Sequence, residues 1–180
     1  MDEIEVPLEQ LQEDIHHHAM HGGERWLSLG AVLSAFLAVF AAISALTAGH
    51  HANEAMIDQI RASDAWSFFQ AKSIKASILE TRIEVLKAMG KPVLEANAKK
   101  LEEYRSEQKE LQKQAKEYEE TSEHHLVHHQ ILAKSVTMFQ IAIALTAISV
   151  LVRRRQLMWV STAFGAIGLG FLGYGLLVAG

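Results

Sequence analysis

The sequence contains no cysteine and only two prolines among its 180 residues. Without cysteine there is no disulfide framework, no thiolate metal site and no cysteine nucleophile. The composition, 49% hydrophobic and 21% charged, excludes collagen-like and compositionally disordered classes. Excess positive charge is lacking as well, because the formal net charge is −4 and the segment up to Arg25 is strongly acidic. The chain therefore has no basic footprint for nucleic acid, and we expect no such partner.

Recognisable catalytic signatures are also missing. The sequence shows no motif that combines a nucleophile with a base and a residue that orients the base. It also contains no phosphate-binding loop, no dinucleotide-binding fingerprint and no pair of acidic residues at a recognisable spacing. The chain is therefore predicted not to be an enzyme, to have no catalytic residues and to bind no organic cofactor.

Charge is nearly absent from three long apolar blocks, which hold a single charged residue, Lys134. About 20 apolar residues suffice for a helix to cross roughly 30 Å of hydrocarbon. The predicted transmembrane helices are residues 27–49, 131–152 and 157–179. A cleaved signal peptide is the competing interpretation of the first block. That block is too long for a signal-peptide core, however, and the segment before it is acidic instead of basic.

The orientation follows from the short basic turn at 153–156, which reads Arg-Arg-Arg-Gln. Short basic loops stay on the cytoplasmic side, and Trp26 and Trp159 fall at the same interface. We therefore expect a cytoplasmic acidic tail at 1–26, with 50–130 and the C-terminus in the periplasm of a bacterial inner membrane. An inverted orientation is the alternative.

Small residues recur at helical spacing in the spans, for example Ala166, Gly170 and Gly173 in the third. Such faces allow close helix packing, either between the spans of one chain or between copies. No ionisable residue sits deep in any span, so a proton relay through the bilayer lacks its usual residues.

Residues 50–130 are interrupted by one strong breaker, Gly90-Lys91-Pro92, with about 40 residues on either side. This pattern predicts a long antiparallel helical hairpin with its turn at 90–92, whose legs continue into the first and second spans. Steps of three and four residues in the return leg predict a coiled-coil seam. The seam positions are Leu94, Leu101, Tyr104, Gln108, Leu111, Ala115, Tyr118, Ser122, His125, His129 and Leu132. The fold class is thus an all-α membrane protein with three transmembrane helices and this hairpin between the first two.

The outgoing leg of the hairpin has two apolar stripes. The first contains Ile57, Ile60, Ala71, Ile74, Ile78 and Val85, and the second contains Trp66, Phe69, Ala76, Leu79, Ile83 and Leu86. One partner helix covers only one stripe, so the leg needs a further neighbour. We expect a homo-oligomer of side-by-side hairpins, with the second stripe as its interface.

Six of the ten histidines flank the predicted outer membrane surface: His50, His51, His124, His125, His128 and His129. Histidines four residues apart share a helix face, which is the spacing of helical metal sites. A tetrahedral Zn²⁺ site, or one for another divalent transition metal, would take His125 and His129 with His51 or His50 opposite, and Glu54 or water as fourth ligand. A pH-responsive cluster and plain interfacial packing are the alternatives. A second candidate metal group is His16, His17, His18 and His21 in the tail.

Several of these segments resemble one known family. They are the acidic tail ending in GERW, AGHHANEAM at 48–56, ASDAWSFFQAKSIKA at 62–76, EHHL from Glu123, and the basic turn before the last span. Over essentially its full length the chain resembles a bacterial membrane-protein family catalogued as domain of unknown function 4337. The resemblance implies inner-membrane proteins without an established activity, and no catalytic residues.

Within the motif at 62–76, Asp64, Trp66, Gln70 and Lys72 lie roughly 20 to 33 Å beyond the predicted membrane by helix rise. These four residues either form a belt around the helix that binds a partner, or they hold the copies of the oligomer together. The second interpretation is preferred, because Trp66 also belongs to an apolar stripe.

Three functions are therefore expected of this sequence. The leading one is a non-catalytic, oligomeric membrane protein that presents a periplasmic helical hairpin as a scaffold or interaction module. The alternatives are a metal- or pH-sensing membrane module built on the histidines, and a pore or transport accessory formed by oligomerised spans.

Overall fold

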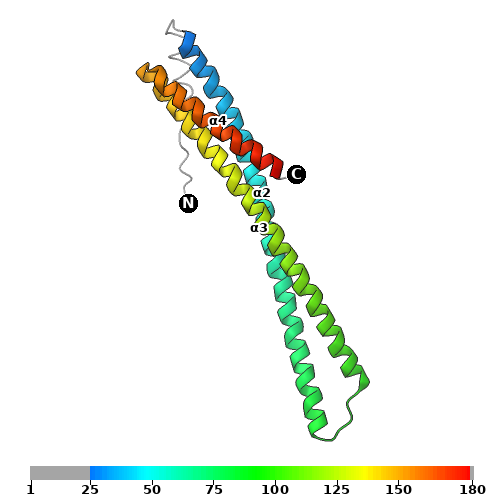
Figure 1. Ribbon diagram of the computed structural model, residues 1–180. Coiled ribbons are helices and arrows are strands. Elements are labelled where there is room, and N and C mark those ends of the chain that lie inside the picture. The colour runs from blue at the N-terminus through cyan, green and yellow to red at the C-terminus, as the bar shows by residue number, and fades with distance from the viewer. Residues whose placement is uncertain (1–24, 179–180) are drawn as a thin grey trace. The chain divides into compact units, whose positions relative to one another are not determined.

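The computed structural model describes residues 25–178, and those residues form three α-helices and no strand (Figure 1). The helices are α2 (Arg25–Ala88), α3 (Glu95–Val152) and α4 (Arg155–Val178). Each contains a stretch long and apolar enough to cross a membrane, by length and composition. The all-α class is therefore confirmed. The tail predicted at 1–26, with the four histidines of the second candidate metal group, lies almost wholly outside the described residues.

The end of α2 is closed by backbone hydrogen bonds around Gly90, as the Gly-Lys-Pro breaker predicts. Gly90 has a φ of 67°, which favours glycine because it lacks a Cβ. Its amide donates to the carbonyl of Lys87 at 3.0 Å, and the amide of Lys91 donates to that of Leu86 at 2.9 Å. These two bonds form a Schellman motif, which satisfies the last carbonyls of the helix and stops it.

The end of α3 uses the same kind of closure without glycine. Arg153 has a φ of 54°, and the amide of Arg154 donates to the carbonyl of Ser149 at 3.1 Å. The Ser149 hydroxyl in turn donates to the carbonyl of Arg154 at 3.0 Å. The break between α3 and α4 is therefore shorter than the predicted turn at 153–156, because α4 already begins at Arg155.

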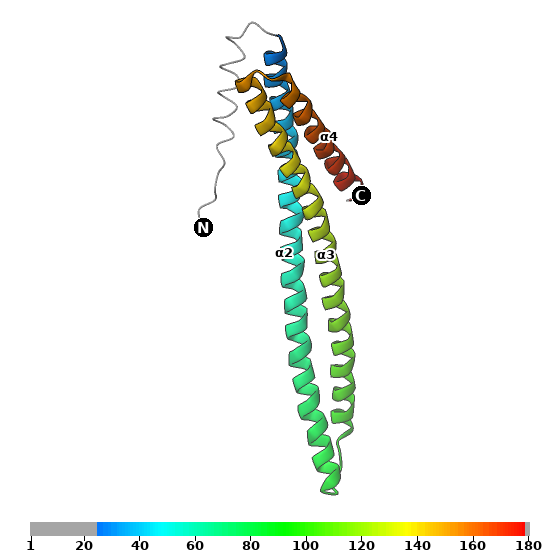
Figure 2. The same ribbon diagram turned by 60° about the vertical axis from the view of Figure 1, so that its left-hand side comes forward.

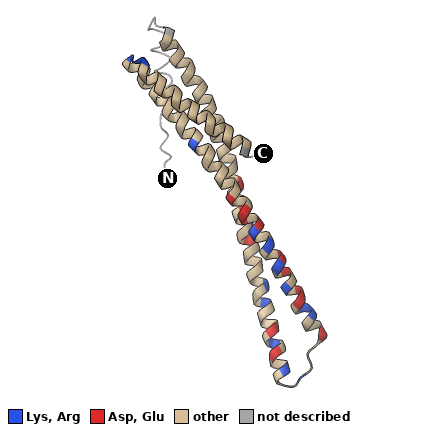
Figure 3. Cartoon of the chain, in the orientation of Figure 1, with Lys and Arg blue, Asp and Glu red and all other residues tan. Residues whose placement is uncertain are grey.

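The described chain divides into two compact units. The apolar unit comprises residues 25–51 and 127–178, and the charged unit comprises residues 52–126. Figure 3 shows the difference in composition: acidic and basic residues crowd the charged unit, whereas the apolar unit is mostly free of them apart from the α3–α4 turn.

The core of the apolar unit gathers around Phe139, which is fully buried and stacks on Phe40 with ring centroids 6.0 Å apart. Leu37 of α2, Leu132 and Ile143 of α3, and Leu172 of α4 belong to the same buried cluster. Three glycines of α4 allow the close approach that this packing needs: a Cβ added at Gly165, Gly168 or Gly175 would come within 2.8 Å of Leu37, Phe139 or Leu132, respectively.

The small residues that the sequence singled out in the third span lie elsewhere on α4. A Cβ added at Gly170 or Gly173 would meet nothing within 4 Å, and Ala166 is exposed. The packed stripe instead runs through Ser161 and the three glycines at 165, 168 and 175. Both stripes have small residues at helical spacing, so spacing alone does not show which one meets the other helices.

Buried hydroxyls cross-link the helices of the apolar unit. The Ser135 hydroxyl of α3 donates to the carbonyl of Gly168 in α4 at 2.9 Å and lies 3.2 Å from the Ser44 hydroxyl of α2. A second pair joins Thr146 and Ser161, whose hydroxyl oxygens are 2.6 Å apart. In an apolar environment such contacts satisfy polar groups that have no water to bond.

In the charged unit, α2 and α3 run side by side and are joined by residues 89–94 (Figure 2). The seam positions of α3 are buried or half-buried from Leu101 onward, and Ala115 is fully buried. Leu94 is 67% exposed, because it precedes the first residue of α3. The Ser122 hydroxyl donates to the carbonyl of Ala55 at 2.8 Å, which links the two helices directly.

Candidate functional site

Two histidines of different helices meet at the end of the apolar unit. His51 of α2 and His128 of α3 have ring centroids 5.1 Å apart in an edge-to-face arrangement, and they are 9% and 2% exposed. His50 is exposed and its ring lies 5.7 Å from that of His51. Two of the predicted outer-surface histidines, from helices far apart in the sequence, thus form a buried ring pair.

His129 is held by a backbone carbonyl of the neighbouring helix. Its Nδ1 lies 2.9 Å from the carbonyl oxygen of Ala48, and a carbonyl oxygen only accepts. Nδ1 therefore carries the hydrogen, and in the neutral ring Nε2 carries the lone pair. Metal-binding histidines are commonly oriented by such a bond from the other ring nitrogen.

The predicted metal ligands do not all fall in one unit. His50, His51, His128 and His129 belong to the apolar unit, whereas Glu54, His124 and His125 belong to the charged unit. Within residues 25–178 the structure shows no group of three or more His, Asp or Glu side chains arranged to hold a metal ion. The zinc site stays a prediction, and the four histidines of the tail lie outside the described residues.

The second apolar stripe of α2 packs inside the charged unit. Ala76 and Ile83 are buried, and Trp66, Phe69, Leu79 and Leu86 are half-buried. The indole Nε1 of Trp66 donates to Oε1 of Glu119 on α3 at 2.8 Å. Within one chain these six residues therefore lie on the face of α2 that meets α3, whereas the sequence placed them between copies. The sequence showed two stripes but did not show which of them α3 covers.

The first apolar stripe of α2, which we call the outer stripe, is the one left exposed. Its large members are 42% exposed at Ile57, 56% at Ile60, 61% at Ile74, 65% at Ile78 and 51% at Val85. Ala71 is exposed as well. A single chain therefore presents a row of branched apolar side chains to its surroundings.

The four residues of the sequence-predicted belt divide between the two faces of α2. Lys72 pairs with Glu107 of α3 and its ammonium lies 5.3 Å from the ring centroid of Tyr104. Trp66 also contacts α3, whereas Asp64 and Gln70 are exposed. The belt is thus not one continuous surface within a chain.

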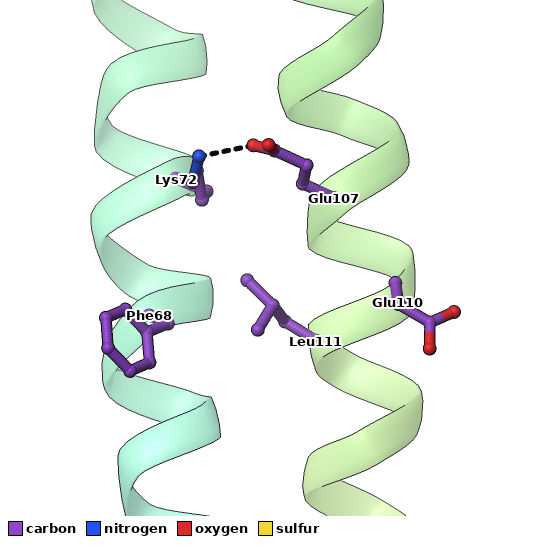
Figure 4. Close-up of a pocket in the computed structure, with 5 residues that line it drawn as sticks. All are labelled: Phe68, Lys72, Glu107, Glu110 and Leu111. Carbon is purple, nitrogen blue, oxygen red and sulfur yellow. Dashed lines mark ion pairs between the residues drawn. The ribbon is translucent and has the colours of Figure 1, made fainter.

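A hollow of about 300 Å³ opens between α2 and α3 in the charged unit. Figure 4 shows it lined by Phe68 and Leu111, with the Lys72–Glu107 ion pair on one side and Glu110 directed away. Phe68 is 62% exposed.

Ion pairs add polar links in the charged unit. The guanidinium of Arg105 contacts Glu80 across the two helices at 2.5 Å. On the exposed face of α3, Lys100 donates to Glu103 at 2.8 Å. This hydrogen bond, assisted by the attraction of the opposite charges, lowers the pKa of Glu103 and raises that of Lys100.

One buried carboxylate escaped the sequence analysis. Asp58 is only 5% exposed, and Arg61 donates to it at 3.0 Å within α2. The guanidinium carbon of Arg61 also lies 5.9 Å from the ring centroid of Tyr118 on α3. The three-residue spacing of acid and base was the available signal, and the burial follows from the position of Asp58 on the face that meets α3.

The family model of a domain of unknown function, DUF4337, matches residues 26–178. The chain belongs to the DUF4337 family. The matched range includes both units of this DUF4337 protein, with the histidine ring pair and the outer stripe. No curated protein and no solved structure matches the chain.

Proposed function

We propose that this DUF4337 protein is a non-catalytic, oligomeric membrane protein that presents its charged unit outside the bilayer as a scaffold or interaction module. The observation that carries the proposal is the outer stripe. Ile57 and Val85 at its ends are separated by about 42 Å of helix. Soluble proteins rarely leave several large apolar side chains on one helix face uncovered unless that face meets a partner.

Burial in lipid is a poor alternative cover for the outer stripe. The charged unit contains 14 acidic and 12 basic residues, and charged side chains are costly in hydrocarbon. The stripe lies on α2 among Arg61, Asp64, Lys75 and Arg82, all of them exposed. Its cover is therefore protein, and the simplest protein available at the same membrane is a second copy.

The proposed location is a bacterial inner membrane with the N-terminus in the cytoplasm and the charged unit in the periplasm. The guanidinium carbon of Arg155 lies 5.6 Å from the ring centroid of Trp26. The start of α2 and the α3–α4 turn therefore share one end of the apolar unit. Three arginines in that turn favour its retention in the cytoplasm.

The test is the mass of the purified full-length protein in detergent, measured by light scattering after size exclusion. We expect the wild type to be an oligomer and the variant Ile74→Glu/Ile78→Glu to be a monomer or to lose most of its assembly. The control Gln59→Glu/Ser106→Glu adds the same charge at exposed positions outside the outer stripe and its flanks, and it should keep the wild-type mass. A monomeric wild type rejects the proposal.

A second candidate function, a metal- or pH-sensing module, is favoured by the His51–His128 ring pair together with the orientation of His129. Imidazole nitrogens suit Zn²⁺. Zinc calorimetry on the wild type and on His51→Ala/His129→Ala distinguishes this function from the first. Larger heat for the wild type supports it, and equal heats remove it. The pore or transport accessory stays a prediction from the sequence.

A further inference from the structure

The outer stripe follows a heptad register of its own. Alternating steps of three and four residues along α2 lead from Ile57 to Ala88. Seven of the ten positions reached are apolar, and the other three are Asp64, Ser67 and Thr81. Every position that these steps reach is exposed in the single chain. A register sustained over about four heptads is the pattern by which helices associate into coiled coils.

We propose that the outer stripes of three or more copies of this chain associate as a parallel, in-register coiled coil of α2 helices. The inference rests on the proposed oligomeric function and names its surface. Copies inserted in one membrane share an orientation, so their α2 helices are parallel and equivalent residues lie at the same level. The outer stripe of one copy can then pack against the outer stripe of the next copy, because both have the same heptad register.

The charges beside the outer stripe are compatible with this arrangement. Arg61, Lys75 and Arg82 occupy one flank, at three of the e positions of the register. In a parallel coil an e position faces the g position of the preceding heptad in the next helix. Those facing residues are Met56, Gln70 and Ser77, all of them uncharged. No two like charges therefore meet along the flanks of the assembly.

The residues inside the register indicate the number of copies. Isoleucine occupies both kinds of core position, with Ile57 and Ile78 at a and Ile60 and Ile74 at d. Isoleucine at both favours three or four strands over two. Asp64 stands at an a position, where its carboxylate meets those of the other copies. This contact between like charges costs stability, and a polar core residue of this kind sets the register. In this arrangement α3 lies outside the α2 core, on the face of α2 that carries Trp66.

Cysteine cross-linking of the full-length protein in native membranes tests the arrangement, since the chain has no cysteine of its own. Ser67→Cys and Ala71→Cys place a thiol at a d and an a position of the outer stripe. Ser106→Cys, exposed on α3, is the matched control. Because a disulfide forms only between close Cβ atoms, we expect about tenfold more cross-linked dimer from the two outer-stripe variants than from the control. When differently tagged Ala71→Cys and Thr81→Cys chains are expressed together, disulfides should join two Ala71→Cys chains or two Thr81→Cys chains. No disulfide should join an Ala71→Cys chain to a Thr81→Cys chain.

The outcomes separate this inference from the proposed function. An oligomer by mass in which Ser67→Cys and Ala71→Cys link no better than Ser106→Cys overturns the outer-stripe coil and leaves the oligomeric function standing. Links between the Ala71→Cys and Thr81→Cys chains overturn the in-register arrangement. A mass of two copies overturns the strand number. A monomer overturns both the inference and the function.

Discussion

Trp66 of α2 donates its indole N–H to the carboxylate of Glu119 on α3 at 2.8 Å, and the two residues stand 53 positions apart in the sequence. Trp66 also packs edge-to-face on Phe69, with ring centroids 5.4 Å apart. The pair shows that the stripe containing Trp66 is an internal surface of one chain. The apolar row of α2 that stays exposed is the outer stripe.

Trp66→Phe should remove the bond to Glu119 while keeping an aromatic ring in place. A hydrogen bond to a charged group contributes about 1.5–3 kcal/mol, and the partial exposure here favours the lower end or less. Thermal unfolding in detergent, followed by circular dichroism, should show a lower Tm for Trp66→Phe. Trp159→Phe is the control, because Trp159 is 76% exposed and should leave Tm unchanged. Equal Tm values for wild type and Trp66→Phe contradict the assignment.

Gly168→Ala and Gly170→Ala should change stability in opposite directions although the two glycines are only two residues apart. A Cβ at residue 168 meets the buried ring of Phe139 at 2.8 Å, whereas a Cβ at residue 170 meets nothing. Overpacking typically costs about 1–3 kcal/mol. Alanine at residue 170 gains up to about 1 kcal/mol of helix propensity. Unfolding in a denaturing-detergent titration measures the change in the free energy of unfolding for each variant. A Gly168→Ala protein as stable as Gly170→Ala would show that α4 packs by another face.

Lys100→Gln should raise the pKa of Glu103, because the hydrogen bond from Lys100 is the main cause of its lowered value. A lowered folded-state pKa stabilises the fold above the pKa of the unfolded chain, and that contribution disappears as pH falls through the folded-state pKa. The pair is fully exposed, so its effect on Tm should be negligible. Carboxyl ¹³C NMR at a series of pH values measures the shift, with Lys109→Gln as control. An unchanged pKa in Lys100→Gln refutes the pairing.

Single cysteines test the proposed orientation in intact cells. Lys91→Cys, in the loop between α2 and α3, should react with a membrane-impermeant maleimide that reaches the periplasm. Arg154→Cys, in the α3–α4 turn, should react only after the inner membrane is permeabilised. The reverse pattern would establish the inverted orientation.

The sequence was sufficient for the helices because their signals are strong. Long uncharged blocks, the glycine–proline breaker and the heptad steps after Leu101 each depend on local chemistry. α2 and α3 accordingly have their ends close to the breaker and the arginine turn. Leu94 was misplaced in the seam because a heptad count does not show where a helix begins.

The choice between equivalent faces was beyond the sequence. α2 has two apolar stripes and α4 has two small-residue stripes, and which of them is covered depends on packing against another helix. The same reason explains why Ser135 was not identified as a link to Gly168: a lone serine in an apolar span has many candidate partners. For the histidines, the sequence placed His51 opposite His125 and His129, and the structure shows its ring against that of His128.

The most direct test of the central claim counts the copies of the wild-type protein extracted with native lipid into nanodiscs, by native mass spectrometry. We expect three or more chains per particle for the wild type, and single chains for Ile74→Glu/Ile78→Glu. A wild type that carries one chain per particle at every protein concentration would contradict it.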